Sequence, residues 1–566
     1  MRVAKGAQIA AGTALLALGV AACGGGGSGS GGSGSDGGTN PRAADGTVYI
    51  RGCEPQTGFV PGNINETCGG TINQFVYDQL IKYNTDTAAP ELSQAESIES
   101  PDNKVWTIKL KPGLKWSDGT PVTAKNYVDA WNYTAYTPNA QNGGWWFGSV
   151  EGYSDVATED PDGADGPKEA PKPAKETMSG LEVIDDLTFK VTLQAPEAVF
   201  RTKLGYTTFS PLPEAFFKDP KAFAANPVTN GPFKFVKWDH NSQIVVEAVA
   251  DYPGAEKPKV KKIVYKMYKD DDAAYADLVS NNLDFTELVP PSALAGDKWK
   301  SDLGDRAIEG QQGVIQTVTF PLYDKEFGGN ADFRKALSLA IDRKTITDKI
   351  FNKGRVPIDG WISPLVEGYK TPGACGEFCT FDPAKAKEYL AKAKAAGYTP
   401  PKEYPIWYNG DSAHKEWVDA TANSINQALG ADAGFTVVGK ATPTFAEFRD
   451  LITNRKMKGA FRTGWQMDYP SIENFLNPLY KTGAGSNDGE FSDKELDAKL
   501  KEADTSTDPA QSILHYQEAE AMLVKEMNAI PLWSYGLQAG TSKWVTGVKV
   551  TPFGVLDPLS IAIKEA

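Results

Sequence analysis

One aspartate stands where a charge is hard to accommodate. Asp468 follows a mostly apolar, strand-like run, residues 460–467, and precedes a Tyr-Pro turn in the stretch GWQMDYPSIENFLNPLY. A carboxylate among large aromatic side chains needs a partner, because a buried and unpaired charge is costly. No Lys or Arg follows within that stretch. The sequence therefore raises the question of which cation Asp468 binds; the alternative is an aspartate that caps the turn before Pro470.

Residues suited to catalysis do not gather in recognisable motifs. The chain contains no Gly-x-Ser-x-Gly, no His-Glu-x-x-His and no Gly-x-x-x-x-Gly-Lys-Ser/Thr. Its three histidines, His240, His414 and His515, are scattered singly. We therefore predict a protein that is not an enzyme and that carries no metal and no cofactor.

Four of the five cysteines form two local couples. Cys53 and Cys68 stand fifteen residues apart, and Cys375 and Cys379 stand four apart. An even number in an exported chain indicates two disulfides. Pairing within each couple is favoured, although four cysteines allow three connectivities. A zinc site is disfavoured, because the couples lie about 300 residues apart and histidines are scarce.

The fifth cysteine, Cys23, indicates export and lipidation. A positive start and the mostly apolar residues 9–22 precede the stretch Val-Ala-Ala-Cys, which is similar to a bacterial lipobox. The apolar run is shorter than the ~20 residues of a membrane span. Ten Gly, four Ser and one Asp follow directly, as expected for a flexible tether. We predict a signal peptide over residues 1–22 and a lipidated tether over residues 23–46, which anchors the protein outside the cell membrane.

Composition and charge describe a large soluble body. The chain has 566 residues, of which 41% are hydrophobic and 23% are charged, so more than one domain is expected. The formal net charge is −14 and no long basic run occurs. Nucleic acid is therefore not expected as a partner.

The periodicity of apolar residues predicts a mixed α/β fold. Alternation typical of strands covers residues 47–51, 104–110, 187–193, 244–250, 260–268 and 460–467. Helical spacing covers residues 71–83, 123–136, 333–351, 382–396, 492–503 and 510–526. Strand-like pieces return after residue 529, which suggests that the C-terminus rejoins an N-terminal domain. Asp468 is thus placed directly after a strand.

Several blocks resemble a known family when taken in order. They are Trp106–Ala124 (WTIKLKPGLKWSDGTPVTA), Asn226–Phe235 (NPVTNGPFKF), Phe333–Arg343 (FRKALSLAIDR), Gly464–Tyr480 and Ile530–Trp533 (IPLW). Together they resemble the extracellular solute-binding proteins of the peptide/nickel class, which serve ABC importers. The resemblance runs from about residue 47 to residue 566.

This resemblance implies an α/β fold of the periplasmic-binding-protein type (type II, cluster C). Such a fold has two lobes that enclose a ligand, with an extra subdomain inserted in the first lobe. By similarity, we expect lobe I at 47–84, 211–315 and 535–566, the inserted subdomain at 85–210, and lobe II at 316–534.

The resemblance also implies a ligand site. In oligopeptide-binding members, the aspartate of a Gly-Trp-x-x-Asp-Tyr segment meets the α-amino group of the ligand, and the preceding strand pairs with the ligand backbone. Gly464, Trp465, Gln466 and Asp468 stand at the matching places. Arg462 matches an arginine that can approach the peptide carboxylate. A weaker match places residues 66–68 at the opposing backbone contact.

We therefore expect a membrane-anchored, monomeric receptor that binds oligopeptides and delivers them to the permease subunits of an ABC importer. A member that binds oligosaccharides would use aromatic side chains such as Trp145, Trp146 and Trp361. A receptor for a nickel complex would favour Arg or His in the cleft. From other classes, a secreted hydrolase or a structural lipoprotein of the cell wall stays open.

Overall fold

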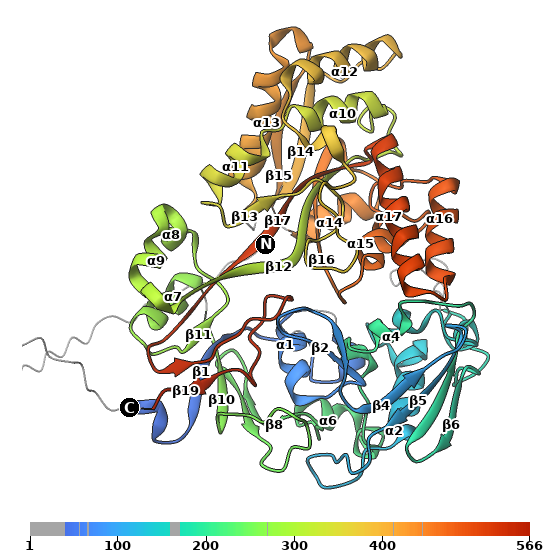
Figure 1. Ribbon diagram of the computed structural model, residues 1–566, viewed down its shortest axis with the longest axis vertical. Helices are drawn as coiled ribbons and strands as arrows, with labels where there is room; N and C mark the ends of the chain where they lie inside the picture. Colours follow the sequence, from blue (N-terminus) through green and yellow to red (C-terminus); the bar gives the residue numbers. More distant parts are fainter. Residues whose placement is uncertain are drawn as a thin grey trace, which may run out of the picture. The chain divides into compact units, whose positions relative to one another are not determined.

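The computed structural model describes residues 40–565, apart from residues 56, 65–66, 159–169, 269, 411–412 and 444. The predicted signal peptide, Cys23 and most of the predicted tether lie outside the described residues, and so do residues 65 and 66. Figure 1 shows the arrangement of the helices and strands.

The largest sheet has eleven strands. Ten follow the order β15-β14-β16-β12-β17-β11-β1-β10-β9-β8, and β13 pairs with β17. The strands are Thr47–Gly52 (β1), Phe233–Asp239 (β8), Gln243–Ala248 (β9), Lys262–Met267 (β10), Phe285–Thr286 (β11), Ala307–Thr319 (β12), Arg355–Pro357 (β13), Glu403–Asn409 (β14), Thr436–Thr442 (β15), Ala460–Gln466 (β16) and Ala529–Thr541 (β17). The alternating stretches that begin at residues 47, 244, 260 and 460 form strands, as predicted.

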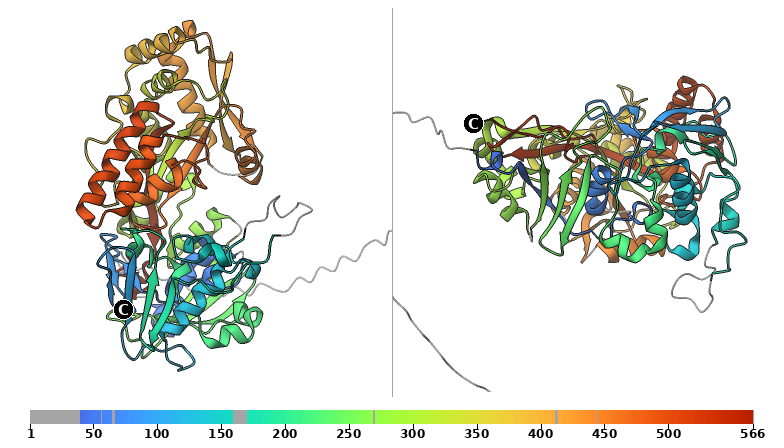
Figure 2. Two further views of the ribbon diagram at one scale, coloured as in Figure 1. Left: turned by 90° about the vertical axis from the view of Figure 1, so that its right-hand side faces the viewer. Right: turned by 90° about the horizontal axis from the view of Figure 1, so that it is seen from below.

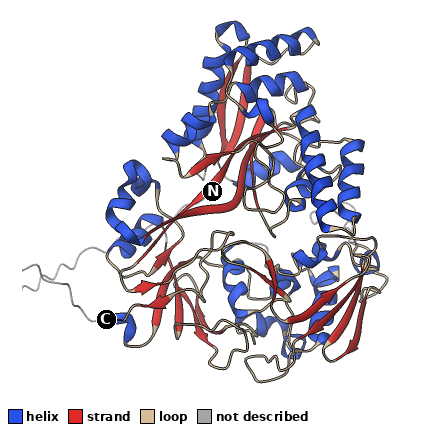
Figure 3. Cartoon of the chain, in the orientation of Figure 1, coloured by secondary structure: helices blue, strands red, loops and turns tan. Residues whose placement is uncertain are grey.

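Two long antiparallel strands, β12 and β17, connect the two hydrophobic cores. They lie side by side in Figures 1 and 3, with thirteen residues each. Leu537 and Ala539 of β17 pack in the first core, whereas Ile315 of β12 and Leu532 of β17 pack in the second. The same pair of strands therefore holds both cores in one sheet.

The first core contains buried residues between 48 and 285 and between 537 and 561. Its smaller strands are Ile81–Tyr83 (β2), Pro90–Leu92 (β3), Val545–Thr546 (β18) and Ala562–Ile563 (β19). Its α-helices, and those of the separate small cluster beside it, are Thr67–Val76 (α1), Ala124–Ala135 (α2), Tyr153–Val156 (α3), Phe200–Lys203 (α4), Glu214–Lys218 (α5), Pro220–Ala225 (α6), Asp271–Val279 (α7), Pro291–Leu294 (α8) and Lys298–Leu303 (α9).

A second, four-stranded sheet belongs to this core. Its antiparallel order is β4-β5-β7-β6, with Ala95–Glu99 (β4), Val105–Leu110 (β5), Leu181–Asp185 (β6) and Thr188–Thr192 (β7). Helix α2 covers it, and the fully buried Trp131 packs against Phe147, Phe189 and Phe209. Thr123 caps α2 in a capping box, as its sequence position predicts. We call this sheet, with α2 and α4, the four-stranded subdomain.

The second core contains buried residues between 315 and 533. Its helices, with α14 beside it, are Ala331–Leu339 (α10), Arg343–Ile350 (α11), Pro383–Ala395 (α12), Lys415–Leu429 (α13), Phe445–Thr453 (α14), Glu473–Tyr480 (α15), Lys494–Thr505 (α16) and Pro509–Glu526 (α17). Helices α16 and α17 pack side by side, as the left view of Figure 2 shows. The residue boundaries predicted for the two lobes and the inserted subdomain stay a prediction.

Two predicted helices differ from the structure. The stretch 333–351 forms two helices, because the side chain of Asp342 accepts the N–H of Thr345 and begins α11 anew. The stretch 71–83 holds only the end of α1, followed by strand β2. The carbonyl of Val76 accepts the N–H groups of Asn230 and Gly231, which takes it out of a continuing helix. Both helix ends depend on partners that local periodicity does not reveal.

Both disulfides form within the local couples. Cys53 pairs with Cys68 at a Cα–Cα distance of 5.3 Å, and Cys375 pairs with Cys379 at 5.7 Å. These distances are ordinary for disulfides. The pairing favoured from the sequence is therefore confirmed.

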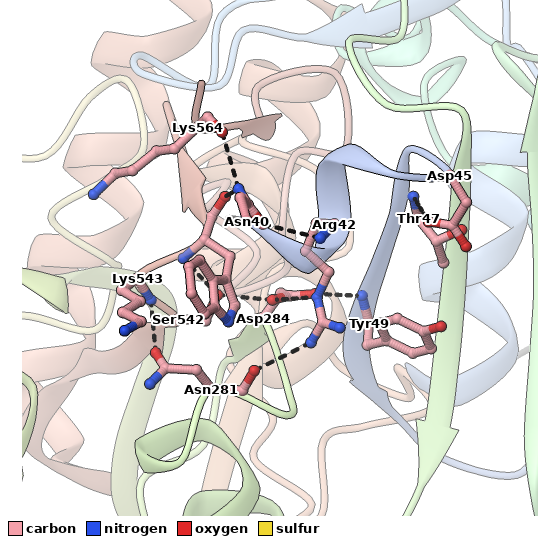
Figure 4. Close-up of polar contacts among 11 residues, drawn as sticks. Asn40, Arg42, Asp45, Thr47, Tyr49, Asn281, Asp284, Ser542, Lys543 and Lys564 are labelled. Carbon is pink, nitrogen blue, oxygen red and sulfur yellow. Dashed lines mark hydrogen bonds and ion pairs between the residues drawn. The ribbon is translucent and has the colours of Figure 1, made fainter. Parts of the chain in front are cut away.

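The first described residues are tied to the end of the chain (Figure 4). The side-chain amide of Asn40 donates to the carbonyls of Trp544 and Lys564, both at 2.9 Å. Two residues on, Arg42 Nε donates to both carboxylate oxygens of Asp284, at 2.8 and 3.1 Å. We call these contacts the terminal clasp; they join the start of the described chain to residues beside its last strands and to Asp284, just before β11.

Candidate ligand-binding site

Strand β16 offers one open edge. It pairs with β12 along most of its length, but with β14 only at its first two residues. The N–H of Met467, just after the strand, donates to the carbonyl of Gly313 on the β12 side, at 2.9 Å. Because backbone groups alternate along a strand, those of Gly464 and Gln466 point to the other edge. No strand among the described residues pairs with that part of the edge.

Asp468 lies at the end of this open edge and is held by Asn474 of α15. The N–H of Asp468 donates to Asn474 Oδ1 at 3.0 Å, and Asn474 Nδ2 donates to Asp468 Oδ2 at 3.2 Å. The indole N–H of Trp465 donates to the same Oδ1 at 3.1 Å. Asn474 is almost fully buried, at 1% exposure. One fixed amide thus orients both the carboxylate and the indole.

The Asp468 carboxylate lacks a contacting cation. Among the described residues, no Lys, Arg or His forms an ion pair with it. Burial raises the pKa of this carboxyl to about 6, and the bond from Asn474 and the positive charge of Lys203 lower it only in part. The chain therefore keeps a half-buried acid that titrates close to neutral pH.

A large hollow lies in front of Asp468. Its volume is about 680 Å³, which is within the usual range for ligand sites. Gln466, Met467 and Asp468 line it from the second core, and the first core contributes most of the remaining wall. The phenols of Tyr83 and Tyr206 also line it; their pKa values are raised by burial and by the negative charge of Asp468. Both phenols and the Asp468 carboxylate thus line the same hollow.

The hollow also carries charges of both signs. Its wall includes Asp78, Asp86, Glu91, Glu256, Asp557, Lys82, Lys111, Lys257, Lys259 and Lys549. Burial raises the pKa of Asp78 to about 6, although Tyr252 donates a hydrogen bond to it at 2.7 Å. Two carboxylates with raised pKa values thus share this hollow, one from each core.

The other predicted site residues lie apart from this hollow, except Gln466. The side-chain amide of Gln466 donates from Nε2 to the carbonyl of Phe553 at 3.2 Å. Gly464 and Trp465 line a smaller cavity of about 200 Å³. Arg462 lines neither cavity; its Nε donates to Asn409 Oδ1 at 2.9 Å. The predicted residues therefore follow one strand but face different surroundings.

The aromatic residues considered for sugar stacking also separate. Trp361 is fully buried, and its indole N–H donates to the carbonyl of Ala529 at 2.9 Å, so it cannot reach a ligand. Trp145 is 63% exposed and stacks on Trp146 at 4.7 Å, and Trp146 stacks on Tyr206 at 4.2 Å. This ladder of rings leads from the surface to the wall of the hollow.

Sequence reasoning missed three residues of the site. Asn474 stands six residues after Asp468, and its place at the start of a helix next to an aspartate was an available signal. Tyr83 and Tyr206 come from distant parts of the chain, and no local pattern indicates them. Within the described residues, no group of three or more His, Cys, Asp or Glu could hold a metal ion.

Comparison with known proteins identifies the family. The sequence profile of bacterial extracellular solute-binding proteins, family 5 Middle, matches residues 89–487. The chain belongs to this family. Its members are substrate-binding receptors of ABC importers rather than enzymes.

Individual relatives of this family 5 protein span nearly the whole chain. The oligopeptide-binding protein OppA of Bacillus subtilis is 26% identical, over 86% of each chain. The periplasmic oligopeptide-binding protein OppA of Escherichia coli is 28% identical, over 88% of this chain and 89% of its own.

The fold of the family is shared as well. OppA of Haemophilus influenzae in complex with RPPGFSPFR superposes with a TM-score of 0.72 at 23% identity, over 92% of this chain and 99% of its own. The open, unliganded form of the murein tripeptide-binding protein MppA gives a TM-score of 0.75 at 21% identity, over 92% of this chain and 98% of its own.

In the part of this family 5 protein that the structure describes, no helix combines the length and the apolar character that a membrane crossing requires.

Proposed function

We propose that this protein is a membrane-anchored, extracytoplasmic receptor that binds oligopeptides and delivers them to the permease of an ABC importer. Family membership supports the transport role, and the relatives named for oligopeptide binding support the class of ligand. The observation that carries the proposal is the Asp468 carboxylate, which lacks a contacting cation and lies at the end of an open strand edge.

The α-ammonium of a peptide suits Asp468. A desolvated carboxylate without a counter-ion is destabilising, and a ligand cation removes this penalty. A peptide whose amino end meets Asp468 then runs along β16 from Gln466 towards Arg462, antiparallel to that strand. The backbone groups of Gly464 and Gln466 bind its main chain, which makes recognition tolerant of sequence. Arg462, oriented by Asn409, lies towards the carboxyl end of such a peptide.

The test compares peptides that differ only in the charge of the amino end. Calorimetry with Ala-Ala-Ala and N-acetyl-Ala-Ala-Ala measures the contribution of the ammonium. In the Asp468→Asn variant, we expect affinity for the free-amine peptide to fall by ~10² to 10³-fold, as is typical when one partner of a buried pair is removed. The acetylated peptide should bind both proteins equally weakly.

Asp86→Asn is the matched control, because Asp86 lines the same hollow but already pairs with Lys549 at 2.6 Å. This variant should keep the preference for the free amine. If Asp468→Asn keeps the full preference as well, Asp468 is not the anchor and the proposed site is wrong.

An oligosaccharide is the second candidate ligand, because the ladder of Trp145, Trp146 and Tyr206 presents flat rings beside the hollow. A Trp145→Ala variant separates the two ligand classes. It should leave the affinity for Ala-Ala-Ala unchanged, whereas a sugar receptor would lose affinity for its glycan.

The membrane anchor is proposed to be a lipid on Cys23, which lies outside the described residues. Replacing Cys23 with Ala should release the protein from the membrane fraction, because the thiol that would carry the lipid is gone. Fractionation followed by immunoblotting measures this. A Cys23→Ala protein that stays with the membrane would refute the anchor.

A further inference from the structure

Several contacts between the four-stranded subdomain and the second core come from one short segment, residues 197–203. Helix α4 belongs to the subdomain, because its buried Phe200 packs on Trp106 of β5, with ring centroids 5.5 Å apart. Val199, just before α4, packs against the second core instead. The N–H of Ala198 donates to the carbonyl of Asp504 on α16, at 2.9 Å. This segment therefore forms a junction between the subdomain and the helices that follow β16.

Lys203, at the end of α4, places its ammonium group inside this junction. Its side chain is 19% exposed, and its Nζ lies 2.5 Å from a carboxylate oxygen of Glu197. It also lies 3.9 Å from Glu473 and 5.5 Å from the centre of the Tyr469 ring. The attraction of Glu197 and Glu473 outweighs the loss of solvation and holds the pKa of Lys203 well above its usual value. Lys203 is therefore a permanent positive charge.

Two residues that contact Lys203, Tyr469 and Glu473, stand next to site residues in the sequence. Tyr469 follows Asp468 directly, and its hydroxyl donates to the Glu473 carboxylate. Glu473 precedes Asn474, whose amide orients Asp468. Lys203 thus contacts both ends of the loop 468–474 through two side chains, and its charge also lowers the pKa of Asp468 from a distance.

Other charged and titratable groups surround this arrangement. The phenols of Tyr83 and Tyr206 line the hollow with Asp468, and burial together with the negative charge of Asp468 raises their pKa values. Asn477 bridges Glu473 and Asp504, donating at 3.1 and 2.7 Å. Beyond it, Lys481 lies 3.6 Å from Asp504, whose carboxylate also accepts the hydroxyl of Tyr516 at 2.5 Å. Three carboxylates therefore meet two ammonium groups in the junction, and Lys203 is the one whose positive charge lowers the pKa of Asp468.

We propose that Lys203 is a positioning residue for ligand binding. The four-stranded subdomain places its ammonium group against Tyr469 and Glu473 of the loop 468–474, and this contact fixes the orientation and the charge of Asp468. This inference rests on the proposed function of Asp468 as the anchor of a peptide ammonium. It gives the four-stranded subdomain a part in recognition without any contact between Lys203 and the ligand.

Two substitutions with opposite expected effects on the pKa of Asp468 test the proposal. Lys203→Met removes the positive charge at similar length, so Asp468 is harder to ionise and the pH midpoint for binding of Ala-Ala-Ala should rise. Glu473→Gln removes a negative charge and keeps an oxygen for Tyr469, so this pH midpoint should fall. Lys203→Arg should restore wild-type behaviour. Lys190→Met, whose ion pair with Glu182 lies on the exposed side of the same subdomain, is the control.

Calorimetry with Ala-Ala-Ala between pH 5 and 7.5 provides the readout. At pH 6, Lys203→Met should lower affinity by about tenfold, which is a typical coupling within one salt-bridge network. Midpoints that shift in opposite directions in Lys203→Met and Glu473→Gln support the proposal, because simple loosening of the junction would weaken binding in both. Unchanged midpoints in both variants, or equal shifts in one direction, overturn it.

A measurement without ligand keeps this inference separate from the proposed function. The carboxyl carbon signal of Asp468, followed by NMR against pH, reports its pKa directly and needs no peptide. If that pKa rises in Lys203→Met while Asp468→Asn leaves peptide binding intact, the coupling is correct and the peptide anchor is wrong. If the pKa does not move in Lys203→Met or in Glu473→Gln, the positioning role is wrong whatever the ligand is.

Discussion

Asp284 and Asp468 are two aspartates removed from water whose surroundings differ completely. Asp284 is fully buried, and three donors satisfy its two oxygens: Arg42 Nε, the N–H of Tyr49 at 2.8 Å and the hydroxyl of Ser542 at 2.7 Å. Arg42 also supplies the opposite charge. Asp468 receives one side-chain donor, Asn474, and no contacting cation among the described residues.

This difference separates a structural carboxylate from a functional one. The chain provides every partner that Asp284 needs, so its charge stabilises the fold around the terminal clasp. Asp468 has no contacting cation among the described residues, and it lies where a ligand can supply one. An unpaired carboxylate of this kind lowers the stability of the free protein, and such groups are common at binding sites.

The largest expected effect is the loss of the Asp284 charge. Asp284→Asn removes the negative charge that pairs with Arg42 and places an NH₂ group where the carboxylate accepted hydrogen bonds. The unfolding free energy should therefore fall by about 3–5 kcal/mol, as when a buried ion pair is broken. Urea unfolding at pH 7 measures it. Asp271→Asn is the matched control, because Asp271 also pairs with an arginine, Arg51, at 2.8 Å but is far more exposed; its loss should be below about 1 kcal/mol. Equal effects would remove the distinction between the two pairs.

Asp468→Asn should act in the opposite direction on the ligand-free protein. A carboxyl whose folded pKa is raised from 3.8 to about 6 binds its proton more tightly when folded, so stability falls as pH rises through that window. At pH 7 the variant should therefore be more stable than the wild type by up to about 3 kcal/mol, and below pH 4 the difference should shrink to under about 1 kcal/mol. Urea unfolding at both pH values provides the check; a variant that is less stable at pH 7 would mark Asp468 as a capping residue of its turn.

The smallest expected effect is the pH dependence of binding in the wild type. Binding requires an ionised Asp468 and a protonated peptide amine. Both conditions are met only between about pH 6 and about pH 8. Below pH 6, affinity for Ala-Ala-Ala should fall by about tenfold per pH unit, and that for N-acetyl-Ala-Ala-Ala should not follow. Isothermal titration across pH 4.5–7.5 tests this, and parallel profiles for the two peptides would contradict it.

The sequence predicted elements whose signals are local. The helices predicted over residues 123–136 and 382–396 form as α2 and α12, where the side chains of Thr123 and Asp382 stand before the first turn as caps. Strand β16 was predicted from its apolar run, and Asp468 was placed at its end correctly. The break at Asp342 within the predicted long helix was missed because its periodicity continues across the cap.

The candidate site was only partly predictable, for a physical reason. The charge of Asp468 was conspicuous because its own neighbours are apolar. Asn474 was within reach of a local argument, whereas Lys203 depends on the packing of a subdomain far away in sequence. The open edge of β16 follows from where β14 stops pairing, which is a property of the whole sheet. The roles of Arg462, Gly464, Trp465 and Gln466 stay predictions.

The terminal clasp has a mechanical consequence. A pull on the chain ahead of Asn40 acts first on two bonds to the carbonyls of Trp544 and Lys564, and then on the Arg42–Asp284 pair. The force is thus shared with the last strands of the chain, within the first core. Residues between these last strands, among them Lys549 and Phe553, line the hollow, and the carbonyl of Phe553 accepts the side-chain amide of Gln466, so tension on the amino-terminal end reaches the wall of the candidate site.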